Sequence, residues 1–156
     1  MAQRVLTAAA VLRSPSVLIA DEPTKGLDTN LTAAVIKALI TAKNFHASSL
    51  LLITHDLHSA GRIADRVAVM YAGEILESAP ADDFFKLPLH PYSRLLLGSL
   101  PENDFRPISG MSPPLSSPPE GCRFYSRCPS AKNPCRCSKP PHVQYEKREV
   151  RCFLYS

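Results

Sequence analysis

The chain has 156 residues, of which 45 % are hydrophobic, and this is typical of one soluble globular domain with a small appendage. No apolar run approaches the ~18 residues that a membrane-spanning helix needs, and residues 1–4 do not begin a secretory signal pattern. We therefore expect any contact with a membrane to go through a partner protein.

The net charge of +4 is unevenly distributed along the chain. Residues 1–100 balance nine Lys and Arg against nine Asp and Glu, whereas residues 101–156 carry nine against five. Ten of the fifteen prolines and all five cysteines also lie beyond residue 100. Two regions of different character are therefore predicted to meet near Pro101. The second is too small and irregular to fold without a stabilising cross-link such as a disulfide or a bound metal.

Predicted helices and strands alternate along the first region. In chain order they are a helix over residues 1–12, a strand over 16–20, a helix over 31–42, a strand over 49–54, a helix over 56–64 and a hairpin of residues 67–71 and 74–78. Two small helices follow, one after Pro80 and one over 90–100. This order predicts an α/β fold with a mostly parallel sheet, whose first two strands are buried.

The second region shows little regular pattern. Residues 101–121 are rich in proline and have no apolar period, so they are predicted to be a linker. Residues 122–156 hold all the cysteines and are predicted to form a small irregular tail.

Polar side chains follow both strands of the predicted parallel pair. Asp21 and Glu22 come after the first strand, and His55 comes after the second. Ligands of open α/β sheets bind at the carboxyl ends of the strands. One carboxylate can hold hydrated Mg²⁺, the other can deprotonate an attacking water, and the imidazole can hydrogen-bond a terminal phosphate. A solvated loop, a helix cap or an incidental histidine would give the same residues, and these alternatives stay open on the residues alone.

Four short segments resemble, in the right order, segments of the ABC ATPases. Residues 21–24 (Asp-Glu-Pro-Thr) resemble the Walker B segment, 26–28 (Gly-Leu-Asp) the D-loop and 54–56 (Thr-His-Asp) the H-switch, while 1–4 (Met-Ala-Gln-Arg) resemble the end of the ABC signature. Residues 69–75 are similar to the segment that follows the H-switch. The resemblance implies a P-loop NTPase-like fold and the cofactors ATP and Mg²⁺.

The resemblance also implies a role for each matching residue. Asp21 would serve the Mg²⁺ shell, Glu22 would be the general base and His55 would contact the γ-phosphate. Asp28 would contact the second ATPase subunit across a dimer, and Gln3 would belong to the signature end. No Gly-x-x-x-x-Gly-Lys-Ser/Thr loop occurs in the chain. We therefore expect a carboxyl-terminal portion of such an ATPase, which does not bind or hydrolyse ATP well by itself.

The five cysteines, at positions 122, 128, 135, 137 and 152, leave several chemistries open. Their spacing favours zinc only weakly, and an odd number argues against a disulfide framework. Each of them has an arginine as direct neighbour, and this is expected to lower the pKa of the thiols and to offset the charge of a thiolate-bound cluster. Metal or cluster binding and unligated cysteines both remain compatible with the spacing.

Two segments around the cysteines resemble the tail of dipeptide, oligopeptide and nickel importer ATPases. These are residues 90–96, which begin His-Pro-Tyr, and residues 121–135. The resemblance implies a [4Fe-4S] cluster held by four cysteines. The matching positions are Cys122, Cys128, Cys135 and Cys152, with Cys137 as the spare.

The resulting prediction is an ATP-hydrolysing subunit that powers import of di- or oligopeptides, with nickel as a second solute. Its partners would be a second ATPase subunit, membrane permease subunits and, indirectly, a solute-binding protein, at the cytoplasmic face of the membrane as a peripheral protein. The alternative is a non-catalytic remnant or regulatory metal-binding protein. The basic, aromatic tail could also suggest nucleic-acid binding, but its charge is small and scattered, so we expect no nucleic-acid partner.

Overall fold

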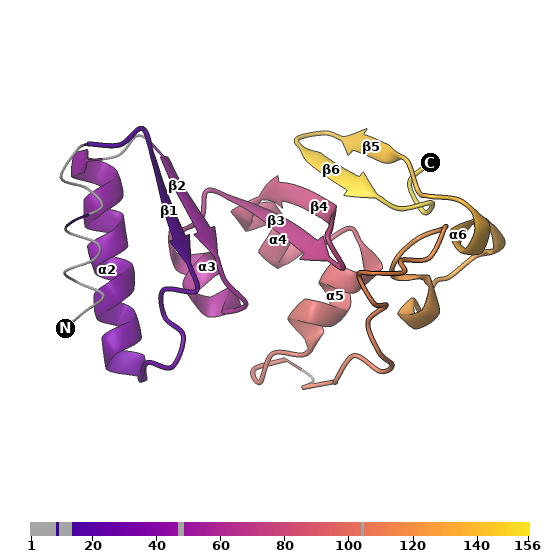
Figure 1. The fold of residues 1–156 in the computed structure, drawn as a ribbon, viewed down its shortest axis with the longest axis horizontal. Coiled ribbons are helices and arrows are strands. Elements are labelled where there is room, and N and C mark those ends of the chain that lie inside the picture. Colours follow the sequence, from indigo (N-terminus) through magenta and orange to yellow (C-terminus); the bar gives the residue numbers. More distant parts are fainter. Residues whose placement is uncertain (1–8, 10–13, 47–48, 104) are drawn as a thin grey trace. The chain divides into compact units, whose positions relative to one another are not determined.

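The computed structural model describes residues 9, 14–46, 49–103 and 105–156 (Figure 1). The chain divides into two compact units, Met1–Ala64 and Asp65–Ser156, so both predicted domain boundaries fall within the second unit. Gln3 and nearly all of the predicted helix over residues 1–12 lie outside the described residues. Within the described part, no helix combines the length and the apolar character needed to cross a membrane.

The first unit is a two-stranded parallel sheet with helices. Strand β1 (Val17–Asp21) pairs with β2 (Ser49–Ile53), Val17 lying opposite Ser49. Helix α2 (Thr29–His46) connects the two strands, and α3 (Leu57–Ile63) follows β2. These elements confirm the predicted strand–helix–strand–helix order, and α2 is longer than predicted by two residues at its start and four at its end.

One face of this sheet forms a core with α2. Leu18 and Ala20 of β1 pack with Val35, Ile36 and Leu39 of the helix, and all five side chains are buried. Leu50 and Leu52 of β2 pack against the same core. Side chains alternate along a strand, so the side chains between these core residues lie on the other face. In the described structure this face is open: Val17, Ile19, Leu51 and Ile53 are 46–64 % exposed. Apolar runs of this kind suit strands that are buried on both faces, but among the described residues only the face toward α2 is covered.

The second unit is built around a four-stranded antiparallel sheet. Strand β3 (Arg66–Tyr71) and β4 (Glu74–Pro80) form the predicted hairpin, whose turn residues Ala72 and Gly73 both have positive φ, as the tight hairpin turn requires. Helices α4 (Ala81–Lys86) and α5 (Pro91–Gly98) follow and confirm the two small helices predicted there.

The cysteine-rich tail is more regular than predicted. It contains a 3-10 helix η1 (Tyr125–Arg127), helix α6 (Asn133–Cys137) and strands β5 (His142–Tyr145) and β6 (Arg148–Arg151). The sheet order is β3-β4-β6-β5, so the tail completes the sheet that the hairpin begins. The α/β class is confirmed, but the larger described sheet is antiparallel and not part of a mostly parallel one. The reason is the pairing of β6 with β4, which joins segments far apart in the sequence.

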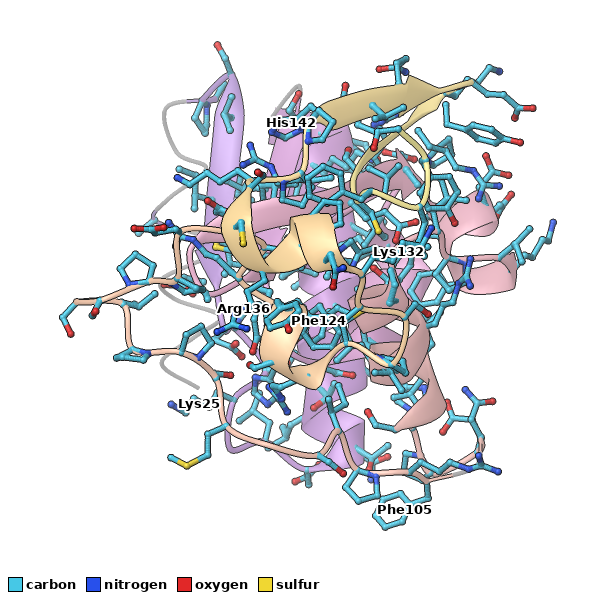
Figure 2. The ribbon with its side chains drawn as sticks, turned by 90° about the vertical axis from the view of Figure 1, so that its right-hand side faces the viewer. Lys25, Phe105, Phe124, Lys132, Arg136 and His142 are labelled. Carbon is cyan, nitrogen blue, oxygen red and sulfur yellow. The ribbon has the colours of Figure 1, made fainter. Side chains whose placement is uncertain are left out.

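Aromatic side chains fill the core beside this sheet. Phe124 is fully buried and lies edge-on to Tyr71, with ring centroids 5.2 Å apart. Figure 2 shows Phe124 inside the unit, whereas Phe105 points outward at the other end of the proline-rich segment 101–121. No helix or strand occurs among the described residues of that segment. It is nevertheless held to the tail, because the Arg127 guanidinium donates to the carbonyl oxygens of Ile108 and Ser109, each at 2.8 Å.

Candidate functional site

The ends of β1 and β2 bring Glu22 and His55 together. The strands are parallel, so their carboxyl ends meet at one edge of the sheet. The Nδ1 atom of His55 lies 2.9 Å from both carboxylate oxygens of Glu22, and the His55 backbone N–H donates to Oε1 at 3.2 Å. The predicted carboxylate–imidazole pair is thus in direct contact in the structure.

The backbone of Glu22 is held in a strained conformation. Its φ is +44°, in the left-handed region that costs a non-glycine residue of order 1–3 kcal/mol. The Glu22 N–H donates to the Ile53 carbonyl at 2.8 Å, which fixes the turn against the end of β2. His55 is 78 % exposed and the Glu22 side chain 31 % exposed. An exposed pair adds little stability, so its contacts do not explain the strain, and such strain is often found at functional sites.

The two other predicted residues of this unit differ in their surroundings. Asp21 is exposed at the end of β1, next to Glu22. Asp28 begins α2: its Oδ1 accepts from the Leu31 N–H at 2.9 Å, as a helix N-cap does. The predicted contact of Asp28 with a second subunit stays a prediction.

Asp56 is a site residue whose role the sequence analysis missed. Its carboxylate accepts the backbone N–H groups of His58 and Ser59 and the Ser59 hydroxyl, so it caps α3 directly after His55. Burial tends to raise the pKa of Asp56, but these hydrogen bonds outweigh it and hold the pKa below its ordinary value. The Asp-x-x-Ser spacing at the start of the predicted helix could have indicated this capping role.

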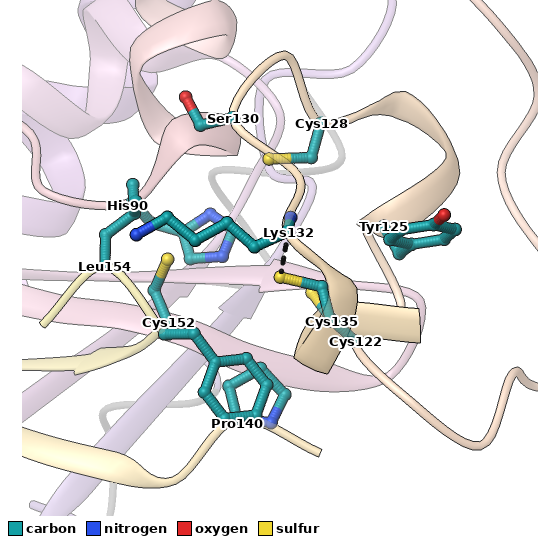
Figure 3. A pocket seen from close by; sticks show the side chains of 11 residues that line it. His90, Cys122, Tyr125, Cys128, Ser130, Lys132, Cys135, Pro140, Cys152 and Leu154 are labelled. Carbon is teal, nitrogen blue, oxygen red and sulfur yellow. Dashed lines mark hydrogen bonds between the residues drawn. The ribbon is translucent and has the colours of Figure 1, made fainter. Parts of the chain in front are cut away.

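A second site lies in the tail, where four cysteines line one pocket (Figure 3). They come from separate segments, before η1, after η1, on α6 and after β6, and they are Cys122, Cys128, Cys135 and Cys152. Cys137 is exposed and does not line the pocket. The structure therefore brings together the four cysteines chosen from the family resemblance and leaves out the fifth.

Backbone N–H groups act on all four thiols of this set. The Lys132 N–H donates to Cys135 Sγ at 3.4 Å, and the N–H groups of Phe124, Ser130 and Leu154 favour the thiolate forms of Cys122, Cys128 and Cys152. In three cases the donor is two residues after the cysteine. Backbone donors of this kind favour the thiolate form, the form that binds metals. No group of three His, Cys, Asp or Glu side chains within the described ranges has the spacing to hold a single metal ion.

Three of these thiols, Cys122, Cys128 and Cys152, are nevertheless neutral at pH 7. Burial raises the pKa of Cys122 to about 11, and burial also raises the pKa values of Cys128 and Cys152. The prediction that the adjacent arginines lower these pKa values is wrong. Arg123 forms an ion pair with Glu74 at 3.0 Å and does not face the thiols. Arg94, from α5, is the cation that offsets part of the rise in the pKa of Cys152.

His90 also lines the pocket, a contact that the sequence analysis did not predict. It is 1 % exposed, and its Nδ1 accepts the Tyr92 N–H at 3.0 Å, so it caps α5. The buried carboxylate of Glu77 accepts the N–H groups of Leu89 and His90 at 2.7 and 2.9 Å. Burial and the nearby Arg94 lower the pKa of His90 to about 4, so the ring is neutral at pH 7. The His-Pro pair before a helix was the available signal for the cap.

Known proteins are similar to this chain along nearly its whole length. Residues 76–135 match the model of the oligopeptide/dipeptide transporter, C-terminal region. The chain is 44 % identical over 99 % of its length to the oligopeptide transport ATP-binding protein AppD of Bacillus subtilis and covers 49 % of it. It is 41 % identical over 99 % of its length to the dipeptide transport ATP-binding protein DppD of the same organism and covers 48 % of it. With the probable D,D-dipeptide transport ATP-binding protein DdpF of Escherichia coli the identity is 37 % over 97 % of the chain, which covers 51 % of that protein.

The chain spans about half the length of the curated relatives that it matches. The similarity covers both units described above and confirms the resemblance on which the sequence analysis relied. Along nearly its whole length the chain is thus similar to oligopeptide and dipeptide transport ATP-binding proteins, and residues 76–135 match the C-terminal region of such transporters.

Proposed function

We propose that the chain is part of the ATP-hydrolysing subunit of an ABC transporter that imports di- or oligopeptides. The names of its relatives support the class of protein and of solute. The observation that carries the catalytic part of the proposal is the contact between Glu22 and His55 at the ends of adjacent parallel strands. Import of nickel is the second solute class that the family resemblance allows.

Glu22 would act as the general base for the attacking water. A carboxylate offers about four acceptor positions, and the contacts with the His55 backbone and ring use only part of them. The turn that holds the Glu22 backbone fixes the direction of the remaining positions, and such positioning is the main contribution of a protein to phosphoryl transfer. Asp21, exposed beside it, is the residue that would hold Mg²⁺, and the ion supplies charge neutralisation at the phosphates. His55 would orient the base and contact the terminal phosphate.

The proposal includes the partners that such a subunit requires. A second ATPase subunit would face Asp28, and membrane permease subunits would place the protein peripherally at the cytoplasmic face of the membrane. A solute-binding protein would act indirectly, through the permease. These partners follow from the kind of transport that the names of the relatives describe.

The test compares variants in a complete subunit, in which these residues are joined to a phosphate-binding loop, assembled with its transporter. We expect Glu22→Gln to lower kcat by about 10²–10⁴-fold, as loss of a general base does, while ATP binding is retained. His55→Ala should also lower turnover. Glu120→Gln, an exposed carboxylate of the proline-rich segment, is the matched control and should leave turnover unchanged. Unchanged hydrolysis in both site variants would instead favour the non-catalytic alternative.

We further propose that the four-cysteine pocket binds a [4Fe-4S] cluster. A specific observation favours this second function: the four cysteines line one pocket with backbone N–H groups that favour their thiolate forms, and Cys137, which is outside the pocket, is not needed. Clusters of this class are held by four thiolates and tuned by hydrogen bonds to sulfur. The four cysteines would hold such a cluster, which would not require the spacing of a single-ion site, and these side chains do not have that spacing.

The cluster is tested by purification without oxygen, followed by iron and sulfide analysis and absorption near ~400 nm, where thiolate-ligated iron–sulfur proteins absorb. Serine at position 122, 128, 135 or 152 should reduce both iron and absorption, because each change removes one thiolate. Cys137→Ser, the matched control, should leave both unchanged. Stoichiometric zinc without iron would replace the cluster by a zinc site, and a folded, metal-free protein would contradict both.

A further inference from the structure

One polar ring enters the four-cysteine pocket from outside the cysteine-bearing tail. His90 lies at the start of α5, and it lines the pocket together with Cys152 and Cys135 (Figure 3). It is 1 % exposed, so the ring is enclosed by protein. A buried imidazole needs partners for both of its nitrogens, and only one of them is used by the cap of α5.

The hydrogen bond to the cap decides which nitrogen carries the proton. Nδ1 accepts from the Tyr92 N–H at 3.0 Å, and an accepting nitrogen has no proton. The neutral ring therefore carries its proton on Nε2, the ring nitrogen that the helix cap does not use. The pocket is thus lined by an N–H donor that the helix cap has fixed in a single tautomer.

Several contacts hold this ring in place. The Glu77 carboxylate binds the N–H groups of Leu89 and His90, which fixes the backbone before α5. The fully buried ring of Phe124 lies 6.0 Å from the imidazole, centroid to centroid. The donor is therefore set in the folded protein before anything binds at the thiols.

We propose that His90 is a positioning residue of the four-cysteine site, which donates a hydrogen bond from Nε2 to the thiolate-bound group and thereby raises its reduction potential. The inference rests on the proposed cluster. Reduction adds an electron to a group that is already anionic, so a fixed donor stabilises the reduced form more than the oxidised form. The N–H groups of Lys132, Phe124, Ser130 and Leu154 act on the sulfurs from their own loops. His90 adds a side-chain donor that a single substitution can remove.

The experiment separates the cap from the donor. In His90→Asn the side-chain oxygen can still accept the Tyr92 N–H, because Asn is a strong N-cap, but the N–H group in the pocket is lost. We expect anaerobically purified His90→Asn to keep the iron and sulfide content of the wild type. At a fixed potential its ratio of reduced to oxidised cluster should fall about tenfold, which is a midpoint potential about 59 mV lower for one electron. His142→Asn, an exposed histidine on β5, is the matched control and should keep the wild-type potential.

Each other result overturns the inference. An unchanged potential with iron retained would leave His90 as a helix cap only, and loss of iron would make it a ligand. A wild type without iron would overturn the proposed cluster as well, so the two failures are distinguishable. If His90→Asn does not fold, the wild type labelled with ¹⁵N-histidine decides the question by pulsed electron paramagnetic resonance of the reduced cluster. A weak ¹⁵N coupling is expected, whereas a strong one would indicate ligation and the absence of coupling would exclude the contact.

Discussion

Gly121, directly before Cys122, has no room for a side chain. A Cβ atom built there would lie 2.6 Å from the carbonyl oxygen of Arg136 and 2.7 Å from its carbonyl carbon, and closer still to the carbonyl oxygen of Cys135. All of these are backbone atoms at the end of α6, so no side chain can rotate away. We therefore expect Gly121→Ala to separate the Cys122 segment from α6.

The size of the effect follows from these contacts. Ordinary van der Waals contact begins at 3.4 Å, so the two segments would have to separate by roughly 0.8 Å or more. Overpacking of this kind costs about 1–3 kcal/mol. The neighbouring hydrogen bond from the Cys122 N–H to the Cys135 carbonyl, 2.8 Å long, would also be lost, at about 1 kcal/mol. Together they give a decrease of about 2–4 kcal/mol in the free energy of unfolding of the second unit.

The assay is chemical denaturation together with the rate at which the thiols of Cys122 and Cys135 react with a disulfide reagent. Gly98→Ala is the matched control, because no heavy atom lies within 4 Å of the added Cβ and alanine is favourable in a helix. We expect Gly121→Ala to unfold at lower denaturant concentration and to expose both thiols, and Gly98→Ala to do neither. Equal stability and equal thiol reactivity of the two variants would refute the close approach of Gly121 to α6.

Three further predictions concern single side chains. Arg127→Ala should make the proline-rich segment more sensitive to limited proteolysis, because two carbonyl oxygens and one hydroxyl of that segment lose their hydrogen-bond donor. The substitution Arg136→Ala, at an exposed arginine, should not change the proteolysis. Glu77→Gln should destabilise the second unit by about 1.5–3 kcal/mol in urea denaturation, because the carboxylate accepts two buried N–H groups; exposed Glu149→Gln is its control. The pKa of Asp56 is lowered in the folded chain, so the ionised carboxylate stabilises the fold at pH values above its ordinary pKa of 3.8. This stabilisation is lost as the pH falls through the lower pKa of the folded state. Asp56→Ala should abolish this pH dependence in acid titrations followed by circular dichroism.

The elements of the first unit could be predicted because local sequence determines them. Apolar runs that end in polar residues indicated β1 and β2, and the parallel arrangement then placed Glu22 and His55 at one edge. The direct contact of these two side chains could not be predicted, because the Glu22 backbone has a positive φ. A non-glycine residue rarely adopts that conformation, and nothing in the local pattern indicates it.

The second unit was less predictable because its pairings are not local. Strand β6 pairs with β4, with Val150 opposite Glu77, and neither four-residue strand of the tail carries a strong strand pattern. The turn between β5 and β6 contains no glycine, and Glu146 supplies the positive φ instead. The sheet was therefore missed for lack of a local signal.

The arginines beside the cysteines show why adjacency in sequence is a poor guide to charge in a site. Arg123 pairs with Glu74 and donates to the Ala72 carbonyl, and Arg127 binds the proline-rich segment. In irregular segments, side chains of consecutive residues leave the backbone in different directions, so a guanidinium next to a buried thiol in sequence can face away from it. The N–H groups that do reach the sulfurs belong to the backbone and have no sequence signature. The pocket is therefore polarised by fixed dipoles, which any residue except proline can supply, and its donors depend on the path of the chain more than on the identity of the residues that supply them.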